Sequence, residues 1–244
     1  DFLARVHRPD FNGWWCFAFP IEALDAVGLP MACFIRGDDV EFGYRLKQAG
    51  MPTLGWPGLA VWHMPFADKS APWHMFYDRR NSLFANARHR RIGRRAGLGK
   101  LIGGFTHHLL RYDYDRVRAM TLGIVAFSQG AARMEEWTHL DHALLIAETS
   151  KMQIGDCETV MNLHADADFL EPDRLSGFVR SAYMAGRMFL DLAGLPNGTS
   201  KAVRLAPGVL WRPDFAKRPS VVLESDGQGK TIRLYRRDTG QRRQ

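Results

Sequence analysis

The sequence predicts an α/β protein in which short strands and helices alternate, followed by a mostly helical region and a small β-hairpin. Three observations support this. Short apolar runs alternate with Gly and Pro in residues 1–70, apolar side chains recur every three or four residues from Trp73 onward, and two β-rich segments lie near the C-terminus. We therefore divide the chain into an α/β part, residues 1–70, a helical region, residues 71–150, and an extension, residues 151–244.

The α/β part is expected to contain three strands and two helices. Runs of apolar and aromatic residues predict short strands at residues 14–19, 53–54 and 59–62. Helices are predicted at residues 21–27 and 39–49. Asp38 stands at the N-cap of the second helix and Gly50 at its C-cap, and Trp56-Pro57-Gly58 is expected to form a turn.

The rest of the chain predicts helices and then a hairpin. Apolar spacing predicts helices over residues 73–87, 98–110, 115–129, 131–151 and about 171–192. The short connections between the first four are typical of a helical bundle. Two β-rich segments, residues 220–225 and 230–236, flank Asp226-Gly227-Gln228-Gly229, which is the turn signal of a β-hairpin.

The composition is that of a folded globular chain, with 46% hydrophobic and 24% charged residues, so disorder is not expected. The net charge of +7 favours an anionic partner: nucleic acid, a membrane face or a phosphorylated substrate. No uninterrupted apolar stretch reaches the roughly 20 residues that a membrane-spanning helix needs. Cys16, Cys33 and Cys157 form no CxxC pair, so we expect buried, reduced thiols in a reducing compartment.

The adjacent carboxylates Asp38 and Asp39 form the strongest local cluster, because they follow the apolar pair Phe34-Ile35 at the start of a predicted helix. Two neighbouring carboxylates repel each other, so the pKa of one is raised while the other stays ionised. A half-buried carboxylate with a raised pKa suits a general base acting on a sugar hydroxyl. The alternative is structural: Asp38 caps the helix and Asp39 is a solvated residue of the first turn.

Two further clusters offer binding groups. His63 follows Trp62 at the end of a predicted strand, and a neutral imidazole is a common ligand of divalent metals, although a lone His is more often a packed structural residue. Trp14 and Trp15 would point to opposite faces of a strand, so that one fills the core and the other offers a flat face to a sugar. Simple core filling by both is the alternative.

These residues occur in a recognisable order. The chain reads Trp14-Trp15, then Phe34-Ile35-x-x-Asp38-Asp39-x-x-x-Gly43-x-Arg45, then Pro57-Gly58-x-Ala60-Val61-Trp62-His63, and last Trp73, Tyr77 and Arg80-Asn81. This constellation, over roughly residues 10–90, resembles the acceptor half of family 2 glycosyltransferases of the bacterial cell-wall galactofuranosyltransferase type. The resemblance implies that residues 1–70 are the C-terminal, acceptor-side part of a GT-A-like domain.

The resemblance also implies a reaction and assigns its residues. Asp39 matches the catalytic base, Asp38 binds the acceptor sugar beside it, and His63 helps to hold a divalent cation, Mn²⁺ or Mg²⁺, on the donor diphosphate. Trp14 and Trp15 match aromatic residues of the acceptor site, and Trp73, on the helix that follows, is assigned to substrate binding with them. The implied enzyme is an inverting, metal-dependent transferase that moves a sugar, galactofuranose, from a UDP-sugar to a glycan or glycolipid acceptor during cell-envelope polysaccharide synthesis.

The sequence departs from the family pattern in three respects. Gly37 stands where the family has Trp, and Asp78 stands where it often has His, which leaves the acceptor and the linkage open. The family's Asp-x-Asp metal motif lies upstream of the tandem Trp, whereas Asp113-Tyr114-Asp115 and Asp166-Ala167-Asp168 come after the base. We therefore expect the chain to be a fragment that does not turn over in isolation.

Two other functions remain open. The chain could be a non-catalytic module that binds carbohydrate or a lipid-linked glycan, or a protein that binds an anionic polymer. The basic stretch Arg88–Arg95 is either a solvated helix end or a contact with an anionic membrane surface, which would place the protein in the cytoplasm at the inner face of the plasma membrane. No nucleic-acid-binding motif is present, so nucleic acid is not an expected partner. Assembly into a homo-oligomer is left open.

Overall fold

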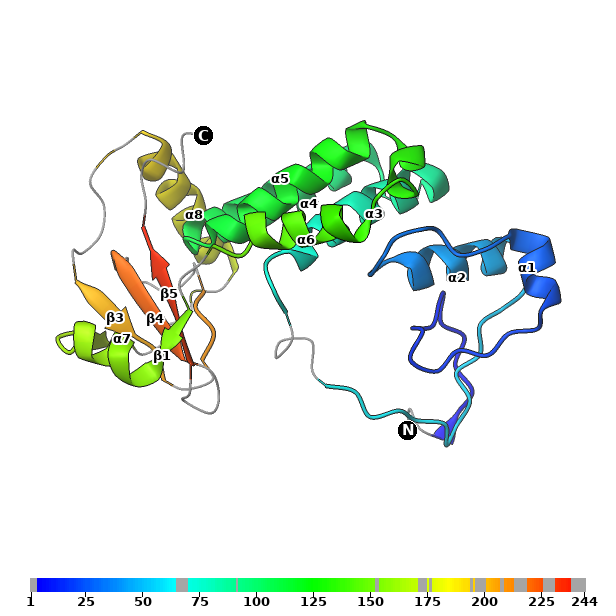
Figure 1. The fold of residues 1–244 in the computed structure, drawn as a ribbon, viewed down its shortest axis with the longest axis horizontal. Helices are drawn as coiled ribbons and strands as arrows, with labels where there is room; N and C mark the ends of the chain where they lie inside the picture. The colour runs from blue at the N-terminus through cyan, green and yellow to red at the C-terminus, as the bar shows by residue number, and fades with distance from the viewer. Residues whose placement is uncertain are drawn as a thin grey trace. The chain divides into compact units, whose positions relative to one another are not determined.

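The computed structural model describes residues 4–64, 70–90, 92–151, 154–170, 175, 177–193, 195, 201–206, 209–212, 219–225 and 231–237. The chain divides into two compact units, Asp1–Gly93 with Ala119–Thr149, and Arg94–Arg118 with Ser150–Gln244. The described residues are mixed α/β, as the sequence predicts (Figure 1). These units are defined by contacts and not by function, so the division into residues 1–70, 71–150 and 151–244 stays a prediction.

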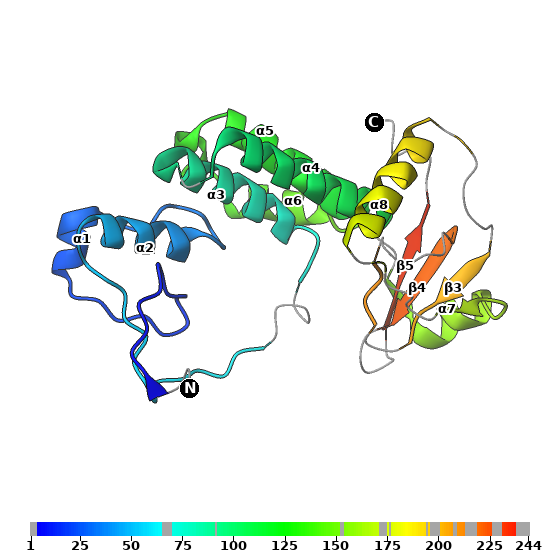
Figure 2. The ribbon, with the colours of Figure 1, turned by 180° about the vertical axis from the view of Figure 1, so that it is seen from behind.

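The first unit has two hydrophobic cores. Helix α1 (Glu22–Val27) packs on α2 (Asp38–Gln48) through Ala23, Phe42 and Leu46, with Phe17 and Phe19 against them. The second core joins α3 (His74–His89), the later part of α5 (Tyr114–Ser128) and α6 (His139–Glu148). Figures 1 and 2 show α2 lying beside α1. The predicted helices at 21–27, 39–49 and 73–87 are confirmed.

The predicted strands of the first part are wrong. Among described residues 4–64 the only β pairing is an isolated bridge between His7 and Gly55, and residues 14–19, 53–54 and 59–62 form no strand. Trp14-Trp15 lies in a turn, and Trp62 is 94% exposed. A strand needs a neighbour that accepts its backbone hydrogen bonds, and β propensity alone does not supply one. The turn at residues 56–58 is confirmed by a 3.3 Å hydrogen bond from the Leu59 N–H to the Trp56 carbonyl.

The structure corrects the boundaries of two predicted helices. Asp38 is the first residue of α2, and its N-cap is Gly37, whose φ of 92° is left-handed. The predicted helix over residues 131–151 is broken into the 3₁₀ turn η2 (Ala131–Met134) and α6. The break comes at Thr138, which forms a capping box with Asp141 and so begins a new helix.

Removal of the Thr138 hydroxyl is expected to cost about 1 kcal/mol of unfolding free energy, because Thr138→Ala leaves the Asp141 N–H in the first turn of α6 without its acceptor. Urea denaturation measures this loss. Ser82→Ala is the matched control, since Ser82 is exposed inside α3 and its hydroxyl donates only to the Arg79 carbonyl. A Thr138→Ala protein as stable as the control would contradict the prediction.

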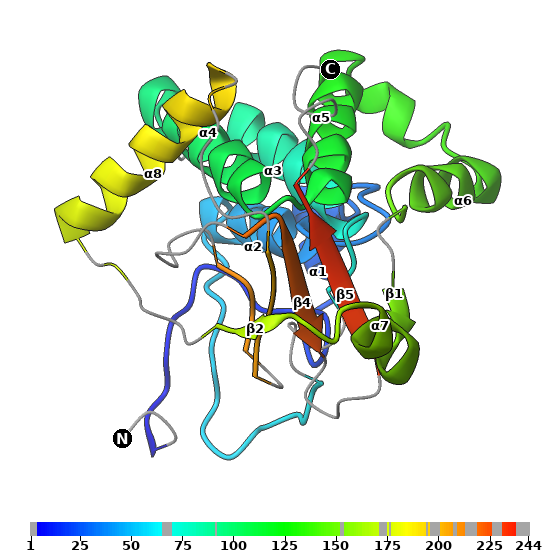
Figure 3. The same cartoon turned by 90° about the vertical axis from the view of Figure 1, so that its left-hand side faces the viewer.

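The second unit contains α4 (Arg94–Leu110), α7 (Cys157–Leu163), α8 (Gly177–Leu192) and a five-stranded sheet of order β1-β5-β4-β3-β2. The strands are β1 (Ile154–Asp156), β2 (Asp168–Phe169), β3 (Ala202–Arg204), β4 (Val221–Ser225) and β5 (Thr231–Arg236). The predicted hairpin is confirmed: β4 and β5 are antiparallel, with Leu223 opposite Leu234 (Figure 3). Its turn, residues 226–229, lies outside the described residues, as does the predicted helix start at residues 171–173.

The Asp-x-Asp string at residues 113–115 has a structural role here. The buried Asp113 carboxylate forms an ion pair with Arg116 and lies 3.8 Å from Nδ1 of His108. Burial alone would raise the pKa of Asp113, but the nearby His108 imidazole and the charge of Arg116 outweigh it and hold that pKa well below its usual range. Within the described ranges, no helix combines the length and apolar character that crossing a bilayer requires.

Candidate active site

The loop that delivers Asp38 and Asp39 is held in an unusual backbone conformation. Phe34 and Arg36 have φ values of 67° and 63°, and Gly37 has a φ of 92°. A residue with a side chain pays about 1 kcal/mol or more for the left-handed region. The loop therefore needs contacts from outside itself to keep this shape.

Two buried side chains of α3 supply those contacts. The Asn81 amide donates to the carbonyls of Ile35 at 2.9 Å and Arg36 at 2.7 Å. Arg80 donates through Nη2 to the Cys33 carbonyl at 2.9 Å and through Nε to Oδ1 of Asn81, also at 2.9 Å. Both side chains belong to residues that are 1% exposed. We call this arrangement the Arg80–Asn81 clamp.

A charged contact also joins α3 to the loop. Arg36 forms an ion pair with Asp78 at 3.4 Å, and its second guanidinium nitrogen lies 3.2 Å from Nδ1 of His74. Burial raises the pKa of the Asp78 carboxyl, and the charge of Arg36 opposes that shift. The Asp78 side chain therefore contacts the loop that precedes Asp38 and Asp39.

The two carboxylates have different surroundings. Oδ2 of Asp38 accepts a 2.7 Å hydrogen bond from the Trp14 indole, and Oδ1 of Asp39 accepts a 2.8 Å bond from the Val40 N–H. Burial raises the pKa of Asp39, and the charge of Asp38 raises it further, while the backbone bonds oppose the shift. A half-buried carboxylate with a raised pKa suits the role of a general base.

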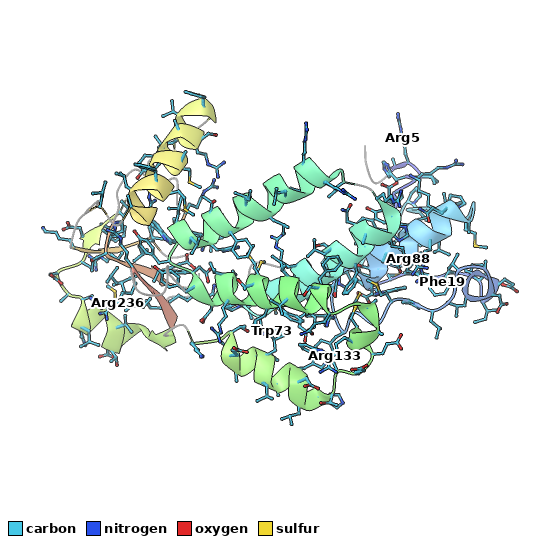
Figure 4. All side chains as sticks on the ribbon, turned by 90° about the horizontal axis from the view of Figure 1, so that it is seen from above. Arg5, Phe19, Trp73, Arg88, Arg133 and Arg236 are labelled. Atoms are coloured by element: carbon cyan, nitrogen blue, oxygen red, sulfur yellow. The ribbon has the colours of Figure 1, made fainter. Side chains whose placement is uncertain are left out.

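The start of α2 is also anchored by Glu41. This fully buried carboxylate lies 2.9 Å from Nη2 of Arg45 and 3.1 Å from Nε2 of His89. Arg45 in turn donates to the Leu29 carbonyl at 2.8 Å, and also to the Val27 carbonyl, so it ties α2 to the end of α1. Arg88 also reaches Glu41 at 3.4 Å, so the first residue of the basic stretch Arg88–Arg95 has a partner inside the unit (Figure 4).

The structure brings four of the predicted site residues together in pairs. Trp14 bonds Asp38, and the Trp15 ring lies against the His63 ring with centroids 4.4 Å apart. Trp14 and Trp15 are 37% and 54% exposed, so neither is fully in the core. Trp73 lies at the N-cap of α3, with its ring 5.9 Å from the Tyr77 ring (Figure 4).

The predicted cation site has one candidate ligand in this part of the chain, His63. His63 offers one imidazole, which suits Mn²⁺ or Mg²⁺ only as one ligand of a larger set. Among the residues that the structure describes, no three His, Cys, Asp or Glu side chains gather as a metal site would need. The described residues therefore supply at most one ligand, His63, of a cation site.

The cysteine expectation is partly wrong. Cys33 is buried, whereas Cys16 is an exposed free thiol. Burial, with the nearby charge of Asp38, raises the pKa of the Cys33 thiol to about 12, so it stays protonated. The side chain of Cys157 lies outside the described residues.

Comparison with known proteins shows that the chain is similar to galactofuranosyltransferases. Over 131 residues, 52% of the chain, it is 34% identical to galactofuranosyltransferase GlfT2 of Mycolicibacterium smegmatis. Over 89 residues, 36% of the chain, it is 38% identical to galactofuranosyltransferase GlfT2 of Mycobacterium tuberculosis. These matches confirm the resemblance predicted from the sequence, while no family model matches.

The similarity covers only part of each relative. The matched segment makes up 20% of the Mycolicibacterium smegmatis protein and 14% of the Mycobacterium tuberculosis protein. The chain thus spans a fifth or less of the curated relatives that it matches. Their activity is carried over to this chain only as a proposal.

Sequence reasoning missed the residues that shape the loop. From the sequence, Arg80 and Asn81 are assigned only to a matching helix, and the Arg36–Asp78 ion pair is not predicted. The signal for the clamp was weak: an Arg-Asn pair on the face of α3 that also carries the buried Phe76 and Tyr77. Burial of two polar side chains on an apolar face indicates buried partners but does not say which ones.

Proposed function

We propose that this chain is the acceptor-side part of an inverting GT-A-type glycosyltransferase that transfers galactofuranose from a UDP-sugar to a glycan or glycolipid acceptor of the cell envelope. The observation that carries the proposal is the half-buried Asp39, whose pKa is raised and whose neighbour Asp38 is held by the Trp14 indole. Similarity to galactofuranosyltransferases over part of the chain supports the choice of sugar.

In the proposed mechanism Asp39 accepts the proton of the acceptor hydroxyl as its oxygen attacks the anomeric carbon of the donor sugar. The new C–O bond forms as the bond from that carbon to the diphosphate oxygen breaks, and UDP leaves with the electron pair. A single displacement of this kind inverts the anomeric configuration. Asp38 and Trp14 would orient the acceptor sugar, and Trp15 would offer it an aromatic face.

A divalent cation, when bound, would neutralise the charge of the leaving diphosphate. His63 is the residue of this chain that we assign to it, through its imidazole next to Trp15. The remaining ligands are not among the groups that the described residues bring together.

The test is a transfer assay on the natural protein that carries this sequence, with UDP-galactofuranose and UDP-galactopyranose as alternative donors and a short galactofuranose oligosaccharide as acceptor. We expect chain extension from the furanose donor alone and an inverted linkage by nuclear magnetic resonance. A reaction without acceptor controls for donor hydrolysis. Extension from neither donor, or a retained linkage, would refute the proposal.

A non-catalytic glycan-binding module is the second candidate. The exposed Trp15 and Trp56 rings favour it, because flat aromatic faces on a surface bind sugars without any chemistry. Saturable binding of the same oligosaccharide, with no transfer from either donor, would select this alternative.

A further inference from the structure

A groove of about 620 Å³ lies in the first unit, between two segments that are far apart in the sequence. Residues 5–16 form one wall and residues 54–61 the other. The His7–Gly55 bridge joins the walls: the His7 N–H donates to the Gly55 carbonyl at 3.1 Å, and the Gly55 N–H donates to the His7 carbonyl at 2.9 Å. The volume is in the range of sites that hold a small ligand.

The lining of the groove is basic. Arg5, His7 and Arg8 all come from the first wall, and no Asp or Glu is among the described residues that line it. Arg5 and Arg8 are exposed, and neither forms an ion pair with a described carboxylate (Figure 4 labels Arg5). A guanidinium group binds phosphate through two parallel hydrogen bonds, so the lining selects an anionic ligand.

The groove also offers flat aromatic faces. Trp15 lies on the first wall and Trp56 on the second, and both are more than half exposed. The Asn12 side chain donates a hydrogen bond to the Cys16 carbonyl, so it restrains the part of the first wall that carries Trp15. Aromatic faces stack on the C–H faces of a sugar ring, so the groove combines sugar stacking with anion binding.

The groove adjoins the candidate active site through Trp15. The ring of Trp15 lies against His63, and the preceding residue, Trp14, bonds Asp38. We propose that this groove binds the phosphate-bearing part of a sugar substrate, with Arg5 and Arg8 on the phosphate and Trp15 and Trp56 on the sugar. The inference rests on the proposed function for the identity of that substrate; its phosphate comes either from a diphosphate-linked acceptor or from the nucleotide donor.

Calorimetric titration of the full chain tests the groove without any transfer reaction. The probes are a galactofuranose disaccharide 1-phosphate, the same disaccharide without phosphate, and UDP. We expect the phosphorylated disaccharide to bind at least tenfold more tightly than the neutral one. The double variant Arg5→Ala/Arg8→Ala should abolish this difference, and Trp56→Ala should weaken both disaccharides by a similar factor.

The matched control is Arg133→Ala, which removes an exposed arginine of the same unit that pairs with Glu136, outside the groove (Figure 4). Its affinities should equal those of the unsubstituted chain. Arginine-dependent binding of UDP would assign the phosphate to the donor, and arginine-dependent binding of the disaccharide phosphate alone would assign it to the acceptor. Equal affinity for both disaccharides together with no arginine-dependent UDP binding would overturn the inference. That result would say nothing about Asp39 as the base in transfer, so a failure of the groove inference can be told apart from a failure of the proposed function.

Discussion

Replacing Asp39 by Asn is expected to lower kcat for galactofuranosyl transfer about a thousandfold in the natural protein that carries this sequence, because a positioned general base contributes roughly 10²- to 10⁴-fold. Asn keeps the side-chain oxygen that accepts from the Val40 N–H, so the start of α2 should be unchanged. What is lost is the ability to take a proton. Steady-state kinetics with UDP-galactofuranose measure the effect.

The same substitution should not destabilise the protein at neutral pH. The pKa of Asp39 is raised in the folded state, mainly by burial, so the folded protein binds this proton more tightly than the unfolded chain does. Its contribution to stability is therefore present at low pH and is lost as pH rises through the raised pKa. At pH 7 the half-buried charge is unfavourable, and we expect the unfolding free energy of Asp39→Asn to equal or exceed that of the parent.

The pH profile gives an independent check. The acidic limb of kcat/KM should lie above pH 3.9, which is about the pKa of an ordinary Asp, and should disappear in Asp39→Asn. Asp38→Asn should mainly raise KM for the acceptor, since we assign Asp38 to binding. Asp25→Asn, an exposed carboxylate on α1, is the control and should leave kcat and KM unchanged. Turnover by Asp39→Asn within a few-fold of the parent would exclude Asp39 as the base.

Asn81→Leu is expected to lower the unfolding free energy by about 2–6 kcal/mol, because it leaves the Ile35 and Arg36 carbonyls without their donor, at about 1–3 kcal/mol each. It also frees Nε of Arg80 from its partner. The loop that keeps Phe34 and Arg36 at positive φ should then relax. Transfer should fall even under conditions where the variant remains folded, because Asp38 and Asp39 follow this loop directly.

Asn86→Leu provides the matched control for the clamp. Asn86 lies on the same helix and makes two side-chain hydrogen bonds, but both go to the backbone of Ile92. This variant should lose stability and keep the kinetic constants of transfer. Urea denaturation and acceptor KM of the two variants are compared. Equal kinetics in Asn81→Leu and Asn86→Leu would show that the clamp stabilises the unit without positioning the carboxylates.

Several local features could be predicted from the sequence alone. The helices α1, α2 and α3 follow from apolar spacing and from their stop signals, with Gly28 at the end of α1 and Gly50 just after α2, both at positive φ. The pairing of β4 with β5 follows from two β-rich segments on either side of an Asp-Gly sequence, which is a hairpin signal. The order of Trp, Asp-Asp and His residues was sufficient to recognise the relatives. These features depend on neighbours in the chain, so a local pattern contains them.

Other features were decided only by tertiary structure. Residues 59–62 have strand-like composition but no described neighbour that pairs with them, and the hairpin became part of a five-stranded sheet through β1, β2 and β3, which are too short to show a pattern. The clamp joins Asn81 to a carbonyl 45 residues earlier, and the raised pKa of Asp39 comes from the burial that results from packing. Hydrogen-bond partners and desolvation are properties of contacts between distant segments, and spacing along the chain does not determine them.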